Sequence, residues 1–114
     1  MNYKIVPTEY FDRQVKILSK KYHSFLDDLE QFKKKLEQKP LMGDDMGDNT
    51  RKVRMAIASK SKGKRGGARV ITLNLLIDVE HTKIYLLTIY DKGQKDAISK
   101  EEIRHLKIIS GLAE

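Results

Sequence analysis

At 114 residues the chain has the length of one domain with its own apolar core, and because it has no cysteine, disulfide frameworks, thiolate metal sites and cysteine nucleophiles are excluded. The formal net charge of +7 is local, since residues 51–69 carry eight basic side chains and no carboxylate, against 15 basic and 16 acidic residues elsewhere. A cationic patch on a nearly neutral body favours a polyanionic partner. No run is apolar enough for a membrane span or a signal peptide, so we expect a cytoplasmic protein with one domain over residues 1–114.

Residues 1–40 predict a short strand followed by two helices. The strand, Tyr3–Val6, ends at a proline, after which Thr8 has the side chain to cap a helix. A capping-box pattern of Ser24 and Asp27 opens a second helix, which ends before another proline. Both helices have apolar residues at helical spacing: Phe11, Val15, Leu18 and Tyr22 in the first, and Phe25, Leu29, Phe32 and Leu36 in the second. We expect two antiparallel helices on one side of a sheet.

The pattern changes to that of strands after residues 40–49, which contain two glycines and three aspartates without any periodicity and are predicted to form a loop. Beyond this loop apolar and charged residues alternate, so a strand is predicted whose outer face carries Lys52 and Arg54 together. Its core-facing residues are Val53, Met55 and Ile57.

Two further strands and a helix complete the chain. Residues 69–77 and 84–90 are apolar at both parities, as in central strands covered on both faces, and residues 78–83 connect them as a hairpin. Ser99 and Glu102 form a capping box that opens a final helix. The apolar stripe of this helix covers part of the other face of the sheet and consists of Ile103, Leu106 and Ile109 or Ser110. The expected fold class is therefore α+β: a short N-terminal strand, two antiparallel helices, a three-stranded antiparallel sheet section and a C-terminal helix.

Cations from two strands and one loop converge in this predicted fold. Lys52 and Arg54 lie on one strand and Arg69 begins the next, so all three meet where the connecting loop, residues 59–67, joins the sheet. The glycines of this loop let its backbone follow an irregular anion, and its basic side chains would neutralise phosphates. These side chains are Lys60, Lys62, Lys64 and Arg65. Tyr90, Lys92 and Lys95 leave the last strand and line the same rim if that strand is adjacent.

Simpler interpretations of these residues stay open. Basic runs with glycine also occur as solvated hairpin tips, although the absence of acids favours binding. A strand-end Tyr90 packs on a helix as readily as it takes part in catalysis. The histidines lie far from the basic stretch in sequence, which favours surface positions over an acid/base pair; they are His23, His81 and His105. The acidic loop lacks the spacing of a calcium site, so no metal site is expected; its carboxylates are Asp44, Asp45 and Asp48.

Five segments together resemble a toxin of the RelE/ParE superfamily of toxin–antitoxin systems, and most of all its HigB-type branch. The resemblance covers essentially the whole chain and is most specific where KGKRGGARVI is followed, some twenty residues later, by the tyrosine-containing strand. The segments are FDRQVKILSKKY (residues 11–22), RKVRM (51–55), SKGKRGGARVI (61–71), YLLTIYDK (85–92) and SKEEIRHLKII (99–109).

The resemblance implies a RelE-like fold and an endoribonuclease that needs neither metal nor cofactor. Such a toxin cleaves messenger RNA on the translating ribosome, by attack of the ribose 2′-hydroxyl on the adjacent phosphate, and so inhibits translation. A cognate antitoxin neutralises it, and any contact with operator DNA passes through that antitoxin.

The family's functional residues carry over by position. Lys52 and Arg54 match the paired basic residues of the second strand, Arg69 the arginine that begins the third, and Lys92 the basic residue after the fourth. The counterpart of the family's C-terminal catalytic tyrosine is an isoleucine, Ile98, so Tyr90 is expected to substitute for it.

Chemistry suggests a role for each group at such a site. Cations crowded together oppose one another's charge, so Lys52 or Lys92 is expected to accept the 2′ proton. Arg54 and Arg69 would stabilise the charge on the phosphate, and the loop cations together with Lys95 would hold the RNA. Two alternatives are a ParE-like inhibitor of DNA gyrase without nuclease activity and a non-catalytic RNA-binding module.

Overall fold

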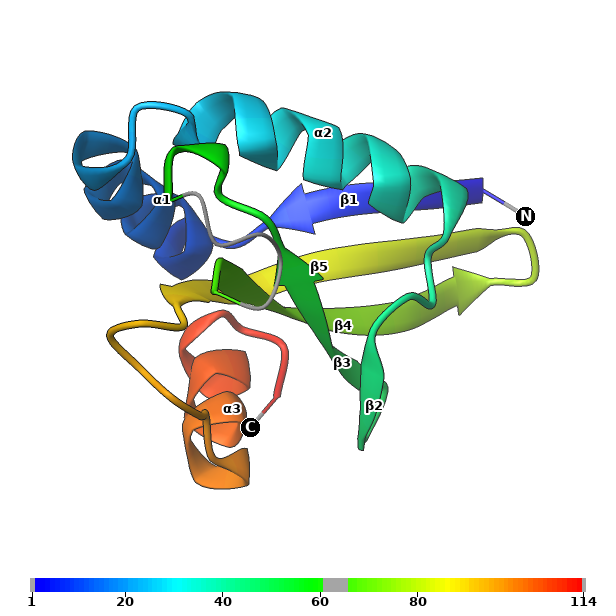
Figure 1. The fold of residues 1–114 in the computed structure, drawn as a ribbon. Helices are drawn as coiled ribbons and strands as arrows, with labels where there is room; N and C mark the ends of the chain where they lie inside the picture. The colour runs from blue at the N-terminus through cyan, green and yellow to red at the C-terminus, as the bar shows by residue number, and fades with distance from the viewer. Residues whose placement is uncertain (1, 61–65, 114) are drawn as a thin grey trace.

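The computed structural model describes residues 2–60 and 66–113 and shows an α+β fold built on one five-stranded sheet (Figure 1). The strand order is β1-β5-β4-β3-β2, with β1 parallel to β5 and all other neighbours antiparallel. The elements are β1 (Asn2–Pro7), α1 (Glu9–Lys21), α2 (Phe25–Gln38), β2 (Asp44–Gly47), β3 (Thr50–Met55), the single 3₁₀ turn η1 (Ala58–Lys60), β4 (Ala68–Asp78), β5 (His81–Asp91) and α3 (Lys100–Ile109). In this part of the chain no helix combines the length and the apolarity needed to cross a membrane.

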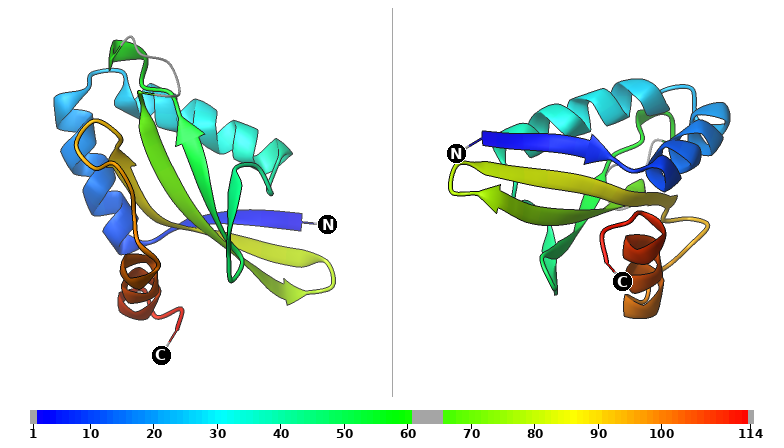
Figure 2. Two further views of the ribbon diagram at one scale, coloured as in Figure 1. Left: turned by 60° about the horizontal axis from the view of Figure 1, so that its bottom comes forward. Right: turned by 180° about the vertical axis from the view of Figure 1, so that it is seen from behind.

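Helices cover both faces of the sheet, as the views in Figure 2 show. α1 and α2 run in roughly opposite directions over one face, where their apolar stripes pack on β3, β4 and β5. Phe11 and Phe25 are fully buried there, and each such ring contributes on the order of 2 to 3 kcal/mol through the hydrophobic effect. α3 covers part of the opposite face, where its Ile103 packs with a smaller cluster of sheet residues: Ile71, Leu73, Leu87 and Tyr90. The expected placement of the three helices is confirmed.

Two of the three predicted helix caps are confirmed. The Thr8 hydroxyl accepts a hydrogen bond from the Phe11 N–H (3.2 Å) and donates one to the Leu86 carbonyl (2.9 Å), which ties the start of α1 to β5. The capping box of Ser99 and Glu102 is formed as predicted.

The box predicted at the start of α2 is wrong. The Ser24 hydroxyl makes no capping bond and instead donates to Asp28 (2.7 Å), because the backbone of Ser24 is already helical. Ser24 Oγ also accepts from the Ser59 N–H (2.9 Å), so this residue joins α2 to η1.

Part of the predicted loop 40–49 is a strand, β2, which pairs with β3. In this four-residue edge strand only Met46 is partly buried, so there is no repeating apolar pattern by which sequence periodicity could reveal it. The glycines serve its turns: Gly43 and Gly47 have φ of 96° and 85°.

The β4–β5 hairpin is longer and less covered than expected. Its connection is only the two residues between Asp78 and His81. Burial on both faces is confirmed for residues 69–73 but is wrong for the outer part of β4, where Leu76 is 65% and Ile77 53% exposed. None of the helices in the described residues reaches this end of the hairpin, so its apolar residues remain on the surface.

Candidate functional site

The register of three strands aligns four of the sequence-predicted site residues on one face of the sheet. Arg54 pairs with Arg69, and Arg69 in turn pairs with Tyr90. Lys52 stands two residues before Arg54 on the same strand and therefore on the same face. Since the alternate residues of β3 and β4 belong to the core under α1 and α2, this row points to the side of α3. We call Lys52, Arg54, Arg69 and Tyr90 the cation row.

Arg69 is the rigid member of the cation row. It is only 6% exposed, and its Nη1 donates to the Ala68 carbonyl (3.1 Å). Burial lowers its pKa, and the charge of Arg54 on the neighbouring strand lowers it further, whereas Tyr90 acts in the opposite sense. A guanidinium stays charged under such shifts. The strand pair thus holds two positive charges side by side before any anion arrives.

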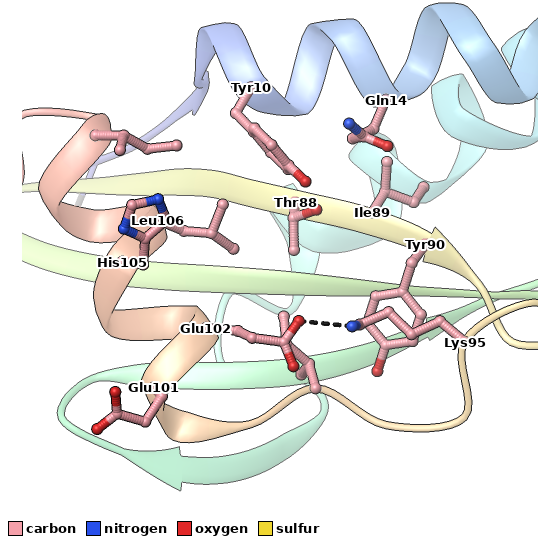
Figure 3. Close-up of a pocket in the computed structure, with 12 residues that line it drawn as sticks. Tyr10, Gln14, Thr88, Ile89, Tyr90, Lys95, Glu101, Glu102, His105 and Leu106 are labelled. Atoms are coloured by element: carbon pink, nitrogen blue, oxygen red, sulfur yellow. Dashed lines mark hydrogen bonds and ion pairs between the residues drawn. The ribbon is translucent and has the colours of Figure 1, made fainter.

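Tyr90 is covered rather than open. It is 8% exposed, and within the described residues its hydroxyl has no hydrogen-bond partner. Burial raises the pKa of Tyr90, while the charges of Arg69 and Lys95 oppose that rise. Figure 3 shows the ion pair of Lys95 and Glu102, 2.6 Å between Nζ and Oε2, beside the Tyr90 ring. The phenol is therefore neutral, and transfer of its proton to a substrate requires displacement of this cover.

Carboxylates that sequence reasoning missed accompany both predicted lysine bases. Lys92 Nζ donates to the Asp96 carboxylate and to the Asp96 carbonyl (2.7 Å). The hydrogen bond from Lys92 and its charge, together with the charge of Lys52, lower the pKa of Asp96. Asp44 is the cross-strand neighbour of Lys52 on β2. The expected crowding of cations is therefore offset by anions. The signal available in the sequence was Asp96, four residues after Lys92 in the same short segment.

The predicted RNA contact Lys60 lies in a buried cluster around Asp91. Its side chain is 11% exposed, and Nζ is 2.7 Å from Asp91 Oδ1. The same carboxylate accepts from the Tyr22 hydroxyl (2.5 Å) and from the Gly93 N–H (2.9 Å), and Lys21 Nζ is 3.4 Å away. Burial opposes ionisation of Asp91, but these donors prevail and lower its pKa to about 2. This Asp91 cluster joins α1, η1 and the end of β5.

The other predicted RNA contacts are less informative. Lys95 is held by Glu102, and this partner raises the pKa of Lys95. Lys62, Lys64 and Arg65 lie outside the described residues. The cation row is thus the part of the predicted site that the sheet brings together, with Lys92 linked to it through Asp96.

A cavity of about 570 Å³ adjoins Tyr90 between α1, β5 and α3 (Figure 3). Tyr10 and Gln14 of α1 contribute to it, and neither was singled out from the sequence, because both fit the polar side of an ordinary amphipathic helix. His105 lines the cavity as well, and it is exposed, as expected for a surface histidine.

Nothing among residues 2–60 and 66–113 forms a group of three or more metal-ligating side chains. No protein-family model matches the chain.

Proposed function

We propose that the protein is a RelE-like toxin of the HigB type: a metal-independent endoribonuclease that acts in the cytoplasm on messenger RNA in the translating ribosome and is neutralised by a cognate antitoxin. The observation that carries this proposal is the cation row, in which strand register sets Arg54 beside Arg69 with Lys52 on the same face. Two neighbouring guanidinium groups, of which Arg69 is buried and held in place, suit the two non-bridging oxygens of a phosphate, which arginine recognises in a bidentate manner.

The reaction is a transfer within the RNA strand. The 2′-oxygen forms a bond to the adjacent phosphorus, the bond from phosphorus to the 5′-oxygen breaks, and the products carry a 2′,3′-cyclic phosphate and a 5′-hydroxyl. Extra negative charge develops on the phosphate in the transition state. Arg54 and Arg69 stabilise that charge, and a preorganised group of this kind contributes roughly 3 to 4 kcal/mol.

Proton transfer falls to the lysines in this proposal. Lys52 makes no ion pair within 4.0 Å among the described residues, so its amino group is accessible to RNA and, in its neutral form, accepts the 2′ proton. The Lys92 ammonium supplies a proton to the departing 5′-oxygen once RNA displaces Asp96. Tyr90 adds a second donor if the Lys95–Glu102 pair opens.

Expression in bacteria tests this proposal. The wild-type protein should arrest translation and leave truncated messages on ribosomes, and the combined variant Lys52→Ala, Arg54→Ala, Arg69→Ala should do neither. An SOS response to broken DNA with intact messages would instead identify a gyrase inhibitor.

One observation favours a second candidate, a non-catalytic RNA-binding module. The Tyr90 hydroxyl is covered and Lys92 is held by Asp96, so two proton-transfer groups are engaged within the protein. This candidate requires that the purified protein bind RNA, with a dependence on the cation row, and never cut it, even on ribosomes.

A further inference from the structure

A groove with a net positive charge lies on the other side of α3 from the cavity beside Tyr90. It has a volume of about 270 Å³ and runs between α3 and the β2–β3 turn. Its basic residues on α3 are Lys100, Arg104 and Lys107, and the opposite wall includes Met46, Asp48 and Thr50. In Figure 1, α3 and β2 project on the same side of the sheet. Residues of both elements line the groove.

Helical spacing explains why α3 has two chemically different sides. Positions 100, 104 and 107 follow one another at intervals of four and three residues, so their side chains form a single stripe. Ile103 and Leu106 fix the rotation of the helix by packing on the sheet. The other stripe, which includes Glu102 and His105, faces the cavity beside Tyr90. The basic side of α3 is therefore turned toward β2 and β3.

The basic side chains of this groove have fewer carboxylate partners than Lys92 and Lys95 in the segment between β5 and α3. Within the described residues Lys100 and Arg104 make no ion pair within 4.0 Å, and Lys107 contacts only a backbone oxygen, that of Asp48 at 3.4 Å. Two carboxylates, Asp48 and Glu101, also line the groove, so its balance is three positive charges against two negative. By contrast, Lys92 and Lys95 are each held by a carboxylate.

The groove continues the cation row. Thr50 lines the groove, and Lys52 and Arg54 follow it on the same face of β3. Alternate residues of a strand are about 6.7 Å apart, so these positions form an unbroken line from Arg54 to α3. If one phosphate of an extended polyanion lies at Arg54, phosphates further along the same strand can therefore contact Arg104.

We infer that this groove binds the phosphate backbone of single-stranded RNA, several nucleotides to one side of the phosphate held by the cation row. The inference rests on the proposed function in that it takes RNA as the polyanion. It adds an RNA-binding surface on α3 that is separate from the basic loop. Because the groove lies to one side of the cation row, bound RNA would leave the site along α3.

RNA binding by the purified protein tests this inference. The triple variant Lys100→Ala, Arg104→Ala, Lys107→Ala is compared with a matched control, Lys16→Ala, Lys20→Ala, Lys34→Ala, which removes three exposed lysines from α1 and α2. The probes are fluorescent single-stranded RNAs titrated at several salt concentrations. One has about three nucleotides, fewer than the site sizes of about 4 to 16 nucleotides known for OB folds, and the other has about ten, within that range. Since each neutralised phosphate contributes a slope of about −0.7 in log K against log[salt], the α3 variant should reduce the slope for the longer RNA by about 2. Binding of the shorter RNA should change little, and the control should leave both slopes unchanged.

Cleavage separates this inference from the proposed function. If translated message is cut at unchanged positions but the α3 variant binds the longer RNA with the wild-type slope, the groove inference is wrong and the nuclease proposal stands. If the α3 variant keeps its RNA affinity but loses binding of polyglutamate, the groove belongs to an acidic protein partner. If the wild-type protein binds neither RNA, the groove inference is wrong, and cleavage of translated message decides the nuclease proposal separately. If circular dichroism shows that the triple variant is unfolded, the single variant Arg104→Glu replaces it in the same assay.

Discussion

A substitution of Arg54 should change the rate of cleavage without changing the stability of the fold. It is exposed on β3 and makes no ion pair in the described part of the chain, so its removal leaves the core intact. We expect Arg54→Ala to slow cleavage of translated message by about 10²- to 10³-fold, as for the loss of one preorganised charge-stabilising donor. The measurement is the rate of appearance of cut message by primer extension.

A neighbour on the same strand provides the control. Arg51 lies on the opposite face of β3, where its Nη1 contacts the Gly43 carbonyl (3.2 Å). Arg51→Ala removes the same charge without touching the cation row and should cleave at the wild-type rate. Equal losses in the two variants would show that only the overall charge matters.

Asp91 carries the residue-scale prediction for stability. Its pKa is lowered from 3.8 to about 2, so the ionised carboxylate stabilises the fold at every pH above about 4, and this contribution disappears as the pH falls toward 2. The shift corresponds to about 2 kcal/mol at pH 7. We expect Asp91→Asn to lose at least that amount in urea unfolding at pH 7, because Lys60 also loses its buried partner.

The pH dependence makes the assignment specific. The difference in unfolding free energy between wild type and Asp91→Asn should shrink as the pH is lowered from 4 to 2. Glu37→Gln, at an exposed position near the end of α2, should show no such difference. A difference for Asp91→Asn that stays constant through this pH window would contradict the role assigned to its charge.

At the scale of elements, Gly67 controls how β3 and β4 come together beneath the cation row. A Cβ at this position would lie 2.2 Å from the Met55 carbonyl oxygen, and the Gly67 carbonyl accepts from the Lys92 N–H (3.0 Å). We expect Gly67→Ala to cost about 3 kcal/mol in urea unfolding, because the backbone must move to relieve the contact.

The turn glycine Gly47 provides the control for Gly67→Ala, because a Cβ at this position meets no neighbouring atom. It has φ of 85° and nothing within 4 Å of its would-be Cβ, so Gly47→Ala adds conformational strain alone, about 1 kcal/mol. A cost for Gly67→Ala no greater than that for Gly47→Ala would mean that the approach of β3 and β4 is looser than the structure shows.

Across the whole molecule, the periodicity of apolar residues predicted the secondary structure wherever one face of an element is buried. The stripes of α1, α2 and α3 and the alternation along β3 all follow from burial, and that alternation sets Lys52 and Arg54 on one face. The adjacency of Arg69 to Tyr90 required the antiparallel pairing of β4 with β5, which the hairpin pattern indicated.

What the sequence left open depends on long-range contacts. Lys60 and Asp91 are 31 positions apart, so no local pattern joins them, and a lysine in a glycine-rich basic loop gave no sign of a buried partner. The strand β2 was not predicted, because an edge strand of four residues is too short to show an apolar periodicity. The cover over Tyr90 arises from the approach of α3 to β5, which only the assembled fold defines.

Cleavage of a message during translation in vitro tests the central claim most directly. Wild type, Arg69→Ala and the control Arg51→Ala are added to translating and to non-translating reactions, and cuts are mapped by primer extension, with thermal unfolding to verify that each variant is folded. We predict cuts only in translated message, produced by wild type and Arg51→Ala and lost in Arg69→Ala. Intact message with the wild-type protein, or the same cuts with a folded Arg69→Ala variant, would contradict the assignment of the cation row as a ribonuclease site.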